Sequence, residues 1–331
     1  MANLNSMKRL FYLAAAISVI FISCDDVTFS PNDPQNSSNW SLQSSGIANN
    51  LKGVFFVDSF TGYAVGNSFP NDSAKIIKTV DGGYSWFKKP VTNSNASFNA
   101  VFFFNSMQGF VIGTSGTILR TFDGGNSWEN LLNPSNTMLT SITFLNTATG
   151  LISGYNGTML RTTNSGTSWQ TVTVPASQDL FSVDRSSINE AFACGEGGTI
   201  LYSNDGGSFW FLQTSPTQYN LNSIYFFDQL TGYACGQNST ILKTTNKGTS
   251  WIIQSTPSTF WLSSVKFTSY SSGVAVGEGG TILKTTDAGS NWIAEFSVTS
   301  NYLRHLFFIN SSNGWAVGEN GTIIYTYNGG D

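Results

Sequence analysis

The stretch TFDGGNSW, Thr121 to Trp128, recurs along the chain with its glycine and tryptophan at fixed positions. Close copies stand at 79–86 (TVDGGYSW), 162–169 (TTNSGTSW), 203–210 (SNDGGSFW), 244–251 (TTNKGTSW) and 285–292 (TTDAGSNW). From Trp86 to Trp292, successive tryptophans are 42, 41, 41, 41 and 41 residues apart. A repeat of that length, rich in short strand-like segments, is typical of a propeller blade of four strands.

The residues between two copies divide into strand-sized segments. In the repeat that ends at Trp251, residues 221–228 (LNSIYFFD) alternate and predict the innermost strand. Residues 232–236 (GYACG) and 240–244 (TILKT) predict the second and third strands, and the fourth begins at the tryptophan. Of 331 residues, 10% are charged and 14% are aromatic, which argues against a disordered chain and a helical bundle. We therefore expect an all-β fold.

The two ends of the repeat array complement each other. The last repeat stops at 326–331 (TYNGGD), before a fourth strand and its tryptophan. The segment from Trp40 to Gln43 reads as a fourth strand with no first three. The sequence therefore predicts a seven-bladed propeller over 40–331, with the N-terminal strand around Trp40 completing the last blade. Closing the ring in this way removes exposed sheet edges.

The recurring turn resembles the Asp-box, the BNR-type repeat of sialidase-like propellers. Its Asp or Asn side chain is expected to accept backbone N–H groups, its Gly to allow a positive φ, and its Trp to bury apolar area. We assign this structural position to Asp81, Asp123, Asn164, Asp205, Asn246, Asp287 and Asn328. Because three of these seven residues are amides, the position does not require acid–base chemistry.

The whole repeat, LxxVxF…GYAVGxxGTILKTxDGGxSW, also resembles the photosystem II assembly-factor family of plants and cyanobacteria. The resemblance runs from about Trp40 to Asp331 and implies a seven-bladed propeller that holds a membrane protein during assembly. Members of that family carry an arginine-rich patch. Here the arginines beyond the N-terminal segment are Arg120, Arg161, Arg185 and Arg304. The resemblance therefore implies the architecture and a scaffold role, without a photosynthetic partner.

The N-terminus has the features of a targeting signal. Lys8 and Arg9 precede an apolar run from Leu10 to Ile22, which is too short for a membrane span and typical of a secretory signal. Because Cys24 follows Ser23 where that run ends, the segment resembles a bacterial lipoprotein signal. We expect a signal peptide at 1–23, starting at Met1 or Met7, lipidation of Cys24 and a flexible tether at 24–39. The alternative is an ordinary cleaved signal with an incidental cysteine.

These features predict the protein's location and exclude some partners. The chain is expected in the bacterial cell envelope, lipid-anchored on the periplasmic side or at the cell surface. Signal removal would take away two of the 15 basic residues and none of the 19 acidic ones. A mildly acidic chain of this kind is not a general binder of nucleic acid or anionic lipid.

Resemblance to sialidase-like propellers places ligand sites on the face opposite the Asp-box turns. An insertion in the first blade puts Phe69 there, as a contact residue or as part of a tolerated surface insertion. Large side chains before the innermost strands could stack on sugars, hold a peptide, or pack as a lid over the core. They are Phe98, Met138, Tyr219, Phe260, Trp261 and Tyr302.

Polar residues at matching positions form a second candidate set on that face. Glu196, Glu278 and Glu319 lie in GEGG or GENG loops, and Arg304 and His305 begin the last inner strand. Together they could bind a cationic or hydroxylated ligand, although solvated turns with one local ion pair explain them more simply. Basic residues in the third strands are expected to reach solvent or a neighbouring Asp-box turn.

The sequence favours a binding protein over an enzyme. We expect a monomeric, lipid-anchored scaffold that binds an envelope protein or a glycan, and no cofactor. The alternative is a glycan-binding propeller or a sialidase-type glycoside hydrolase. One histidine and three cysteines argue against a zinc site, and no Ser/His/Asp set is apparent. Arg304 and Arg185 alone could not form the three-arginine clamp that the sialidase resemblance implies.

Overall fold

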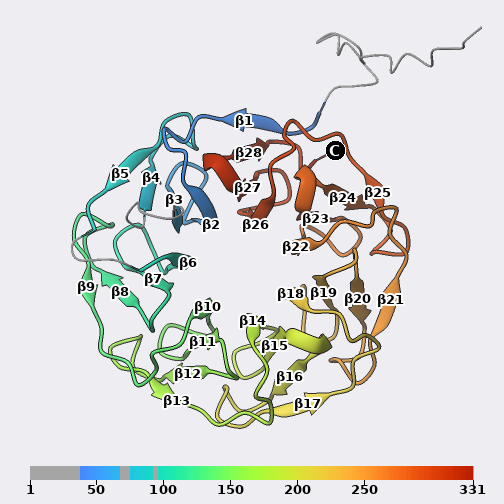
Figure 1. Ribbon diagram of the computed structural model, residues 1–331, viewed down its shortest axis with the longest axis horizontal. Helices are drawn as coiled ribbons and strands as arrows, with labels where there is room; N and C mark the ends of the chain where they lie inside the picture. Colours follow the sequence, from blue (N-terminus) through green and yellow to red (C-terminus); the bar gives the residue numbers. More distant parts are fainter. Residues whose placement is uncertain (1–37, 68–74, 92–95, 331) are drawn as a thin grey trace, which may run out of the picture. The chain divides into compact units, whose positions relative to one another are not determined.

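Seven four-stranded antiparallel sheets surround a central axis in the computed structural model, which describes residues 38–67, 75–91 and 96–330 (Figure 1). This arrangement confirms the predicted all-β, seven-bladed propeller. The helical elements of these ranges are three one-turn 3-10 helices, η1 (Glu196–Gly198), η2 (Glu278–Gly280) and η3 (Glu319–Gly321). No helix within the same ranges is long and apolar enough to cross a membrane.

Each blade runs from an inner strand at the axis to an outer strand at the rim. Blades one to three comprise β2 (Asn50–Phe56), β3 (Gly62–Asn67), β4 (Lys75–Thr79) and β5 (Phe87–Lys89); β6 (Phe98–Phe103), β7 (Gly109–Gly113), β8 (Ile118–Thr121) and β9 (Glu129–Asn130); β10 (Leu139–Phe144), β11 (Gly150–Gly154), β12 (Met159–Thr162) and β13 (Gln170–Thr171). Blades four to six comprise β14 (Leu180–Arg185), β15 (Ala191–Gly195), β16 (Ile200–Ser203) and β17 (Phe211–Gln213); β18 (Leu221–Phe226), β19 (Gly232–Gly236), β20 (Ile241–Thr244) and β21 (Ile252–Gln254); β22 (Leu262–Phe267), β23 (Gly273–Gly277), β24 (Ile282–Thr285) and β25 (Ile293–Ala294).

Blade seven joins the two ends of the ring. It consists of β26 (Leu303–Phe308), β27 (Gly314–Gly318), β28 (Ile323–Thr326) and the N-terminal strand β1 (Ser41–Gln43). β1 pairs antiparallel with β28, with Leu42 opposite Ile324, and the Trp40 side chain is 1% exposed. The predicted closure is therefore confirmed.

The ring begins slightly before the predicted position. Ser38 Oγ donates to the Phe296 carbonyl at 2.8 Å, and Asn39 Nδ2 donates to the Gly330 carbonyl at 3.3 Å. These two residues, placed in the tether from the sequence, therefore contact the ring. The predicted signal peptide, Cys24 and the rest of the tether lie outside the described residues.

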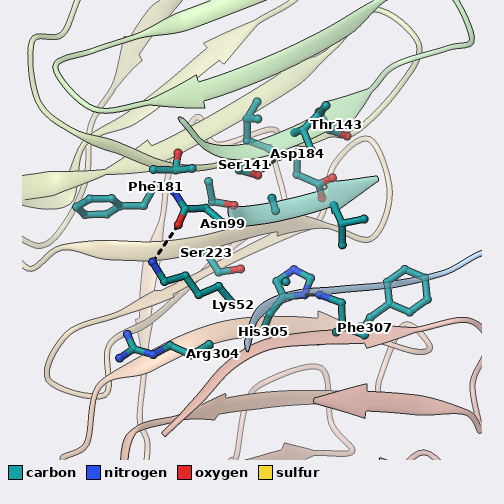
Figure 2. Close-up of a pocket in the computed structure, with 18 of the residues that line it drawn as sticks. Lys52, Asn99, Ser141, Thr143, Phe181, Asp184, Ser223, Arg304, His305 and Phe307 are labelled. Atoms are coloured by element: carbon teal, nitrogen blue, oxygen red, sulfur yellow. Dashed lines mark hydrogen bonds between the residues drawn. The ribbon is translucent and has the colours of Figure 1, made fainter. Parts of the chain in front are cut away.

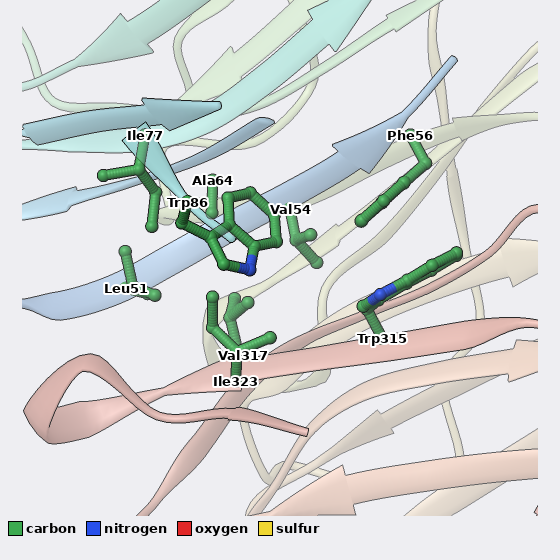
Figure 3. Close-up of a cluster of buried hydrophobic side chains, with 9 residues drawn as sticks. All are labelled: Leu51, Val54, Phe56, Ala64, Ile77, Trp86, Trp315, Val317 and Ile323. Atoms are coloured by element: carbon green, nitrogen blue, oxygen red, sulfur yellow. The ribbon is translucent and has the colours of Figure 1, made fainter. Parts of the chain in front are cut away.

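The hydrophobic core is divided into clusters between neighbouring blades. Figure 3 shows the cluster between blades one and seven, where Trp86 lies beside residues of both sheets. Phe56 of blade one stacks on Trp315 of blade seven with ring centroids 3.5 Å apart. Burying a side chain of this size contributes about 1.5–3 kcal/mol. Because clusters of this kind lie between all neighbouring blades, each blade depends on the next for its core.

The Asp-box turns all lie at the ends of the third strands, on what we call the Asp-box face. Asp123 Oδ1 accepts the Thr121 hydroxyl at 2.8 Å and the Ser127 N–H at 2.9 Å, while Gly125 adopts a φ of +81°. At the equivalent turn of blade three, the amide oxygen of Asn164 accepts the Ser168 N–H at 3.0 Å. An amide thus replaces the carboxylate, because the turn needs only an acceptor.

Basic side chains of the third strands bind the Asp-box turn of the following blade. Lys78 Nζ donates to the Gly124 carbonyl at 3.1 Å, and Lys243 Nζ donates to the Ala288 carbonyl at 2.6 Å. These two charges therefore lie at the Asp-box turn of the neighbouring blade, and their hydrogen bonds add polar links between blades.

Candidate functional site

The inner strands of all seven blades line a central channel with a cavity of about 270 Å³ (Figure 2). Each inner strand is irregular just after its first buried residue, as between Leu51 and Gly53 of β2. The extra residue of such a bulge changes the side-chain alternation, so two consecutive residues can face the same side. Lys52 and Gly53 both line the channel, as do Arg304 and His305 of β26.

Polar side chains in the channel join each blade to the next. Asn99 Nδ2 donates to the Leu139 carbonyl at 2.7 Å, and Asn222 Nδ2 donates to the Leu262 carbonyl at 2.7 Å. All seven boundaries carry such a bond, in the pairs Lys52–Asn99, Asn99–Leu139, Thr140–Leu180, Ser182–Ile224, Asn222–Leu262, Ser263–Leu303 and His305–Val54. The polar side chains of the channel therefore hydrogen-bond neighbouring blades to each other and stabilise the ring.

The channel mouth on the face opposite the Asp-box turns, which we call the loop face, holds two basic side chains, Lys52 and Arg304. Lys52 Nζ donates to Asn99 Oδ1 at 3.0 Å, and burial together with the nearby Arg304 charge lowers its pKa. The Arg304 guanidinium lies 4.0 Å from the Tyr302 ring centroid and forms an ion pair with Glu319. Two cationic groups and an aromatic ring thus meet at this mouth.

Charged groups also line the channel further from the loop face. Asp184 Oδ2 accepts the Phe226 N–H at 3.0 Å, and burial raises the pKa of its carboxyl. Lys266 Nζ lies 4.7 Å from the Tyr225 ring centroid. Burial, with a contribution from Lys266, lowers the pKa of His305 to about 3, so the imidazole is neutral at pH 7.

Several of the predicted binding residues lie on the loop face, Tyr219 before blade five, Phe260 and Trp261 before blade six, and Tyr302 before blade seven. Tyr219, Phe260 and Trp261 are 49%, 49% and 47% exposed. The Glu278 N–H donates to the Trp261 carbonyl at 2.9 Å. In the same way the Glu319 N–H donates to the Tyr302 carbonyl at 3.0 Å. Each acidic turn is therefore fixed against the residue that precedes the inner strand.

Glu196 lies apart from that group, in η1 of blade four. Its backbone N–H donates to the Asp179 carbonyl at 2.8 Å, and its carboxylate accepts the Asp179 N–H at 3.4 Å. The three glutamates thus occupy matching turns, but among the described residues an ion pair is formed by Glu319 and not by the other two.

Two predicted binding residues are placed differently from expectation. Phe98 is fully buried, because it fills the core position that Leu51 occupies in blade one. His305 lies in the channel wall, where Nδ1 accepts the Val54 N–H at 3.4 Å, rather than on the surface. Neither side chain is available to a partner on the loop face. Phe69 lies outside the described residues.

The arginines do not form the clamp of a sialidase-type site. Arg304 lies at the loop-face mouth, whereas Arg185 is at the far end of β14 and donates to the Leu145 carbonyl at 3.1 Å. The part of the chain that the structure describes contains no group of three or more His, Cys, Asp or Glu residues placed to hold a metal ion.

Sequence reasoning missed three charged residues of the channel, Lys52, Asp184 and Lys266. Lys52 shares its repeat position with Arg304, and Asp184 shares one with Lys266, whereas the other blades carry uncharged residues there, such as Asn99 at the position of Lys52. That departure from the repeat was a readable signal. The sequence did not show that these side chains point toward the axis, because their direction depends on the irregular start of each inner strand.

Comparisons with known proteins agree with the propeller fold. The model of the family described as "Photosynthesis system II assembly factor YCF48" matches residues 32–133, 93–179 and 208–297. No curated protein matches the chain.

Solved structures share the fold at low sequence identity. A structure described as YCF48 bound to D1 peptide is 21% identical with a TM-score of 0.74, covering 88% of this chain and 97% of that one. YCF48 from Cyanidioschyzon merolae is 19% identical with a TM-score of 0.72, covering 88% and 99%. A catalytically inactive virginiamycin B lyase from Staphylococcus aureus with quinupristin is 12% identical with a TM-score of 0.71, covering 86% and 98%. At these identities the likeness shows the fold alone.

Proposed function

The chain belongs to the family of the photosystem II assembly factor YCF48, and on that premise we propose that it is a protein-binding scaffold rather than an enzyme. The partner we propose is a protein of the bacterial cell envelope. The domain is a monomer, held in that envelope by a lipid on Cys24. The lipoprotein-like segment from Lys8 to Cys24 supports this location.

The loop face over blades six and seven is the observation that carries this proposal. Phe260, Trp261, Tyr302 and Arg304 present exposed or half-buried aromatic and guanidinium surface there. Residues of these types dominate the binding energy of protein interfaces. Because the acidic turns are bonded to the backbone of Trp261 and Tyr302, this surface is ordered before a partner binds. Such preorganisation reduces the entropy that binding must offset.

A protein partner fits this surface better than a glycan. Arg304 and Lys52 at the channel mouth suit an acidic or carbonyl-rich segment, beside aromatic rings that can pack on its apolar side chains. The structure described as bound to D1 peptide supports a peptide as the ligand class for a propeller of this fold. We propose no photosynthetic partner, because this chain carries few arginines outside its N-terminal segment.

The channel residues support a non-enzymatic role. His305 has a pKa of about 3 and accepts a backbone N–H, so it would not serve as a general base near neutral pH. Asp184 accepts the Phe226 N–H and joins blades four and five. The lyase with the same fold does not argue for activity here, because folds host many functions and its identity to this chain is 12%.

The test is to crosslink the lipidated protein in its native envelope and identify what is recovered with it. We expect a stoichiometric membrane or envelope protein. Trp261→Ala and Tyr302→Ala should each weaken its binding about tenfold or more, because they truncate an exposed and a half-buried anchor residue. Each variant should cost less than about 1 kcal/mol of stability, because neither side chain is part of the buried core.

The matched control is Phe211→Ala, which truncates an aromatic side chain that is 55% exposed on an outer strand. It should leave recovery of the partner unchanged. Equal loss of binding and melting temperature in the Trp261 and Tyr302 variants would show that these residues only pack. Recovery of glycan without protein would contradict the proposal.

A further inference from the structure

The chain enters the propeller at the Asp-box face. β28 leads directly into the last Asp-box turn, so Thr326 is nearer that face than Ile323. β1 is antiparallel to β28, with Ser41 opposite Tyr325 and Gln43 opposite Ile323. The N-terminal end of β1 is therefore the end nearer the Asp-box turns, and Asn39 is bonded there to the Gly330 carbonyl. Any segment that precedes Ser38 joins the ring on this face.

The same face carries large apolar side chains at the tips of its turns. The turns between first and second strands lie against the Asp-box turns, since the Gly82 N–H donates to the Phe60 carbonyl and the Gly124 N–H to the Met107 carbonyl, both at 2.9 Å. Side chains that are at least 50% exposed on these two kinds of turn are Phe60, Val80, Tyr84, Met107, Phe122, Ile188, Phe209, Leu230, Tyr270 and Tyr327. Apolar residues gathered on one face mark an interaction site.

We propose that the Asp-box face is a membrane-contact surface, which rests on a bilayer of zwitterionic lipid and inserts its apolar turn tips among the headgroups. The inference rests on the proposed lipid anchor at Cys24. The segment from Cys24 to Ser38 could extend to about 50 Å at roughly 3.5 Å per residue. That reach lets the domain touch the bilayer by any side, so the apolar tips select the face. The loop face then points away from the membrane.

Charge on this face selects the headgroup. Asp58, Asp123, Asp205, Asp228 and Asp287 all lie in its turns. Hydrogen bonds from Ser127 lower the pKa of Asp123 to about 2, so its carboxylate stays ionised at pH 7. Lys78, Arg161, Lys243, Lys247 and Lys284 bring cations to the same turns, but with Asp81 and Glu190 the carboxylates outnumber them. The face therefore does not favour anionic lipid, whereas the outer group of phosphatidylcholine is cationic.

The experiment places fluorophores on the two faces of a tethered domain. A chain from residue 25 onward keeps every described contact, because the ring is closed within residues 38–330. A hexahistidine tag at its N-terminus is bound to phosphatidylcholine vesicles that contain a nickel-chelating lipid. Tyr84→Cys on the Asp-box face and Thr259→Cys on the loop face each carry a nitrobenzoxadiazole label. Cys194 and Cys235 are fully buried and stay unlabelled.

Lipids brominated in their acyl chains should quench the label at position 84 and leave the label at 259 unaffected. Replacing a third of the phosphatidylcholine by phosphatidylglycerol should reduce that quenching. Phe60→Ser combined with Phe122→Ser should abolish it, whereas the control pair Phe211→Ser and Leu212→Ser on the outer strand should not.

Equal quenching at both positions, or none at 84, would overturn the proposal, as would stronger quenching with phosphatidylglycerol. Because the tag replaces the natural anchor, the result does not depend on lipidation. Mass spectrometry of the native protein tests that step separately. An unlipidated Cys24 alongside face-specific quenching would refute the anchor and leave the membrane-contact surface standing.

Discussion

His305 shows how the ring changes the chemistry of a single residue. It is the one histidine of the chain, and histidine is the side chain that ordinarily titrates near neutral pH. In the channel wall, burial penalises the imidazolium, and the nearby Lys266 charge adds to that effect. Nδ1 accepts the Val54 N–H, so the neutral ring links blade seven to blade one.

His305 should make stability depend on pH below about 6.5. The folded pKa of about 3 lies below the ordinary 6.5, so in that interval the unfolded chain binds a proton that the folded protein does not. Stability therefore falls as the pH is lowered from 6.5 toward 3 and is unaffected by this group above 6.5.

The measurement is urea unfolding at pH 7 and pH 5 for the wild type and His305→Asn, which keeps an acceptor for Val54. Between these pH values the wild type should lose about 2 kcal/mol more than the variant. Parallel losses in the two proteins would show that His305 is not held neutral by the fold.

At the scale of the element, the tryptophan of each repeat packs against its own blade and against the preceding one. Trp169 begins the outer edge of blade three and is 4% exposed. Its ring meets Phe144 of its own blade at 5.9 Å and Phe110 of blade two at 6.2 Å, both edge-to-face. The residue that marks the repeat in the sequence therefore also fills the space between sheets.

Trp169→Ala should destabilise the domain by about 3–5 kcal/mol, because it opens a large cavity between blades two and three. The matched control is Trp261→Ala, which removes the same side chain where it is 47% exposed and should cost less than about 1 kcal/mol. Denaturant unfolding of both variants measures the difference. Similar small losses in the two would contradict the shared-core role of Trp169.

At the scale of the whole molecule, one three-residue strand closes the ring. β1 forms the edge of blade seven, and Trp40 packs in the cluster between blades six and seven with Ile324 and Leu303. The termini of the described domain meet there, since Asn39 is bonded to Gly330.

Removal of residues 38–43 should leave β28 as an unpaired edge and lower the melting temperature. It should also let the outer part of blade seven unfold before the rest, because this blade loses its outer strand and the packing of Trp40. Hydrogen exchange should show faster exchange confined to blade seven. Trp40→Ala is the milder variant and should cost about 3–5 kcal/mol. Unchanged exchange in blade seven of the truncated chain would contradict this account of closure.

The fold could be predicted from the sequence because every blade packs against its neighbours through the same types of residue at the same repeat positions. The closure could also be predicted, because Trp40 has no first three strands before it and the last repeat lacks its fourth strand. The candidate site was harder, because function depends on departures from the repeat. Phe98 follows its tryptophan by twelve residues where Leu139 follows by eleven, and its large ring was mistaken for a contact residue although it fills the leucine position of the core.

Lys52 and Lys266 escaped prediction for a related reason. The irregular start of each inner strand decides which side chains face the axis, and no residue type marks that irregularity. The grouping of Trp261, Tyr302 and Arg304 over two neighbouring blades was only partly foreseeable. Each backbone bond fixes an acidic turn within its own blade, and the grouping arises because blades six and seven are neighbours in the ring, which a linear pattern does not display.

The pairing of β1 with β28 has a consequence for how the protein is made. A ribosome produces β1 before any other strand of the ring and its partner β28 after all the others. Until Ile323–Thr326 are synthesised, β1 has no sheet to join and the growing array has an open end. A chain cut short before Ile323 therefore stays open, with exposed backbone that chaperones and proteases can engage. Completion of synthesis is thus coupled to completion of the fold.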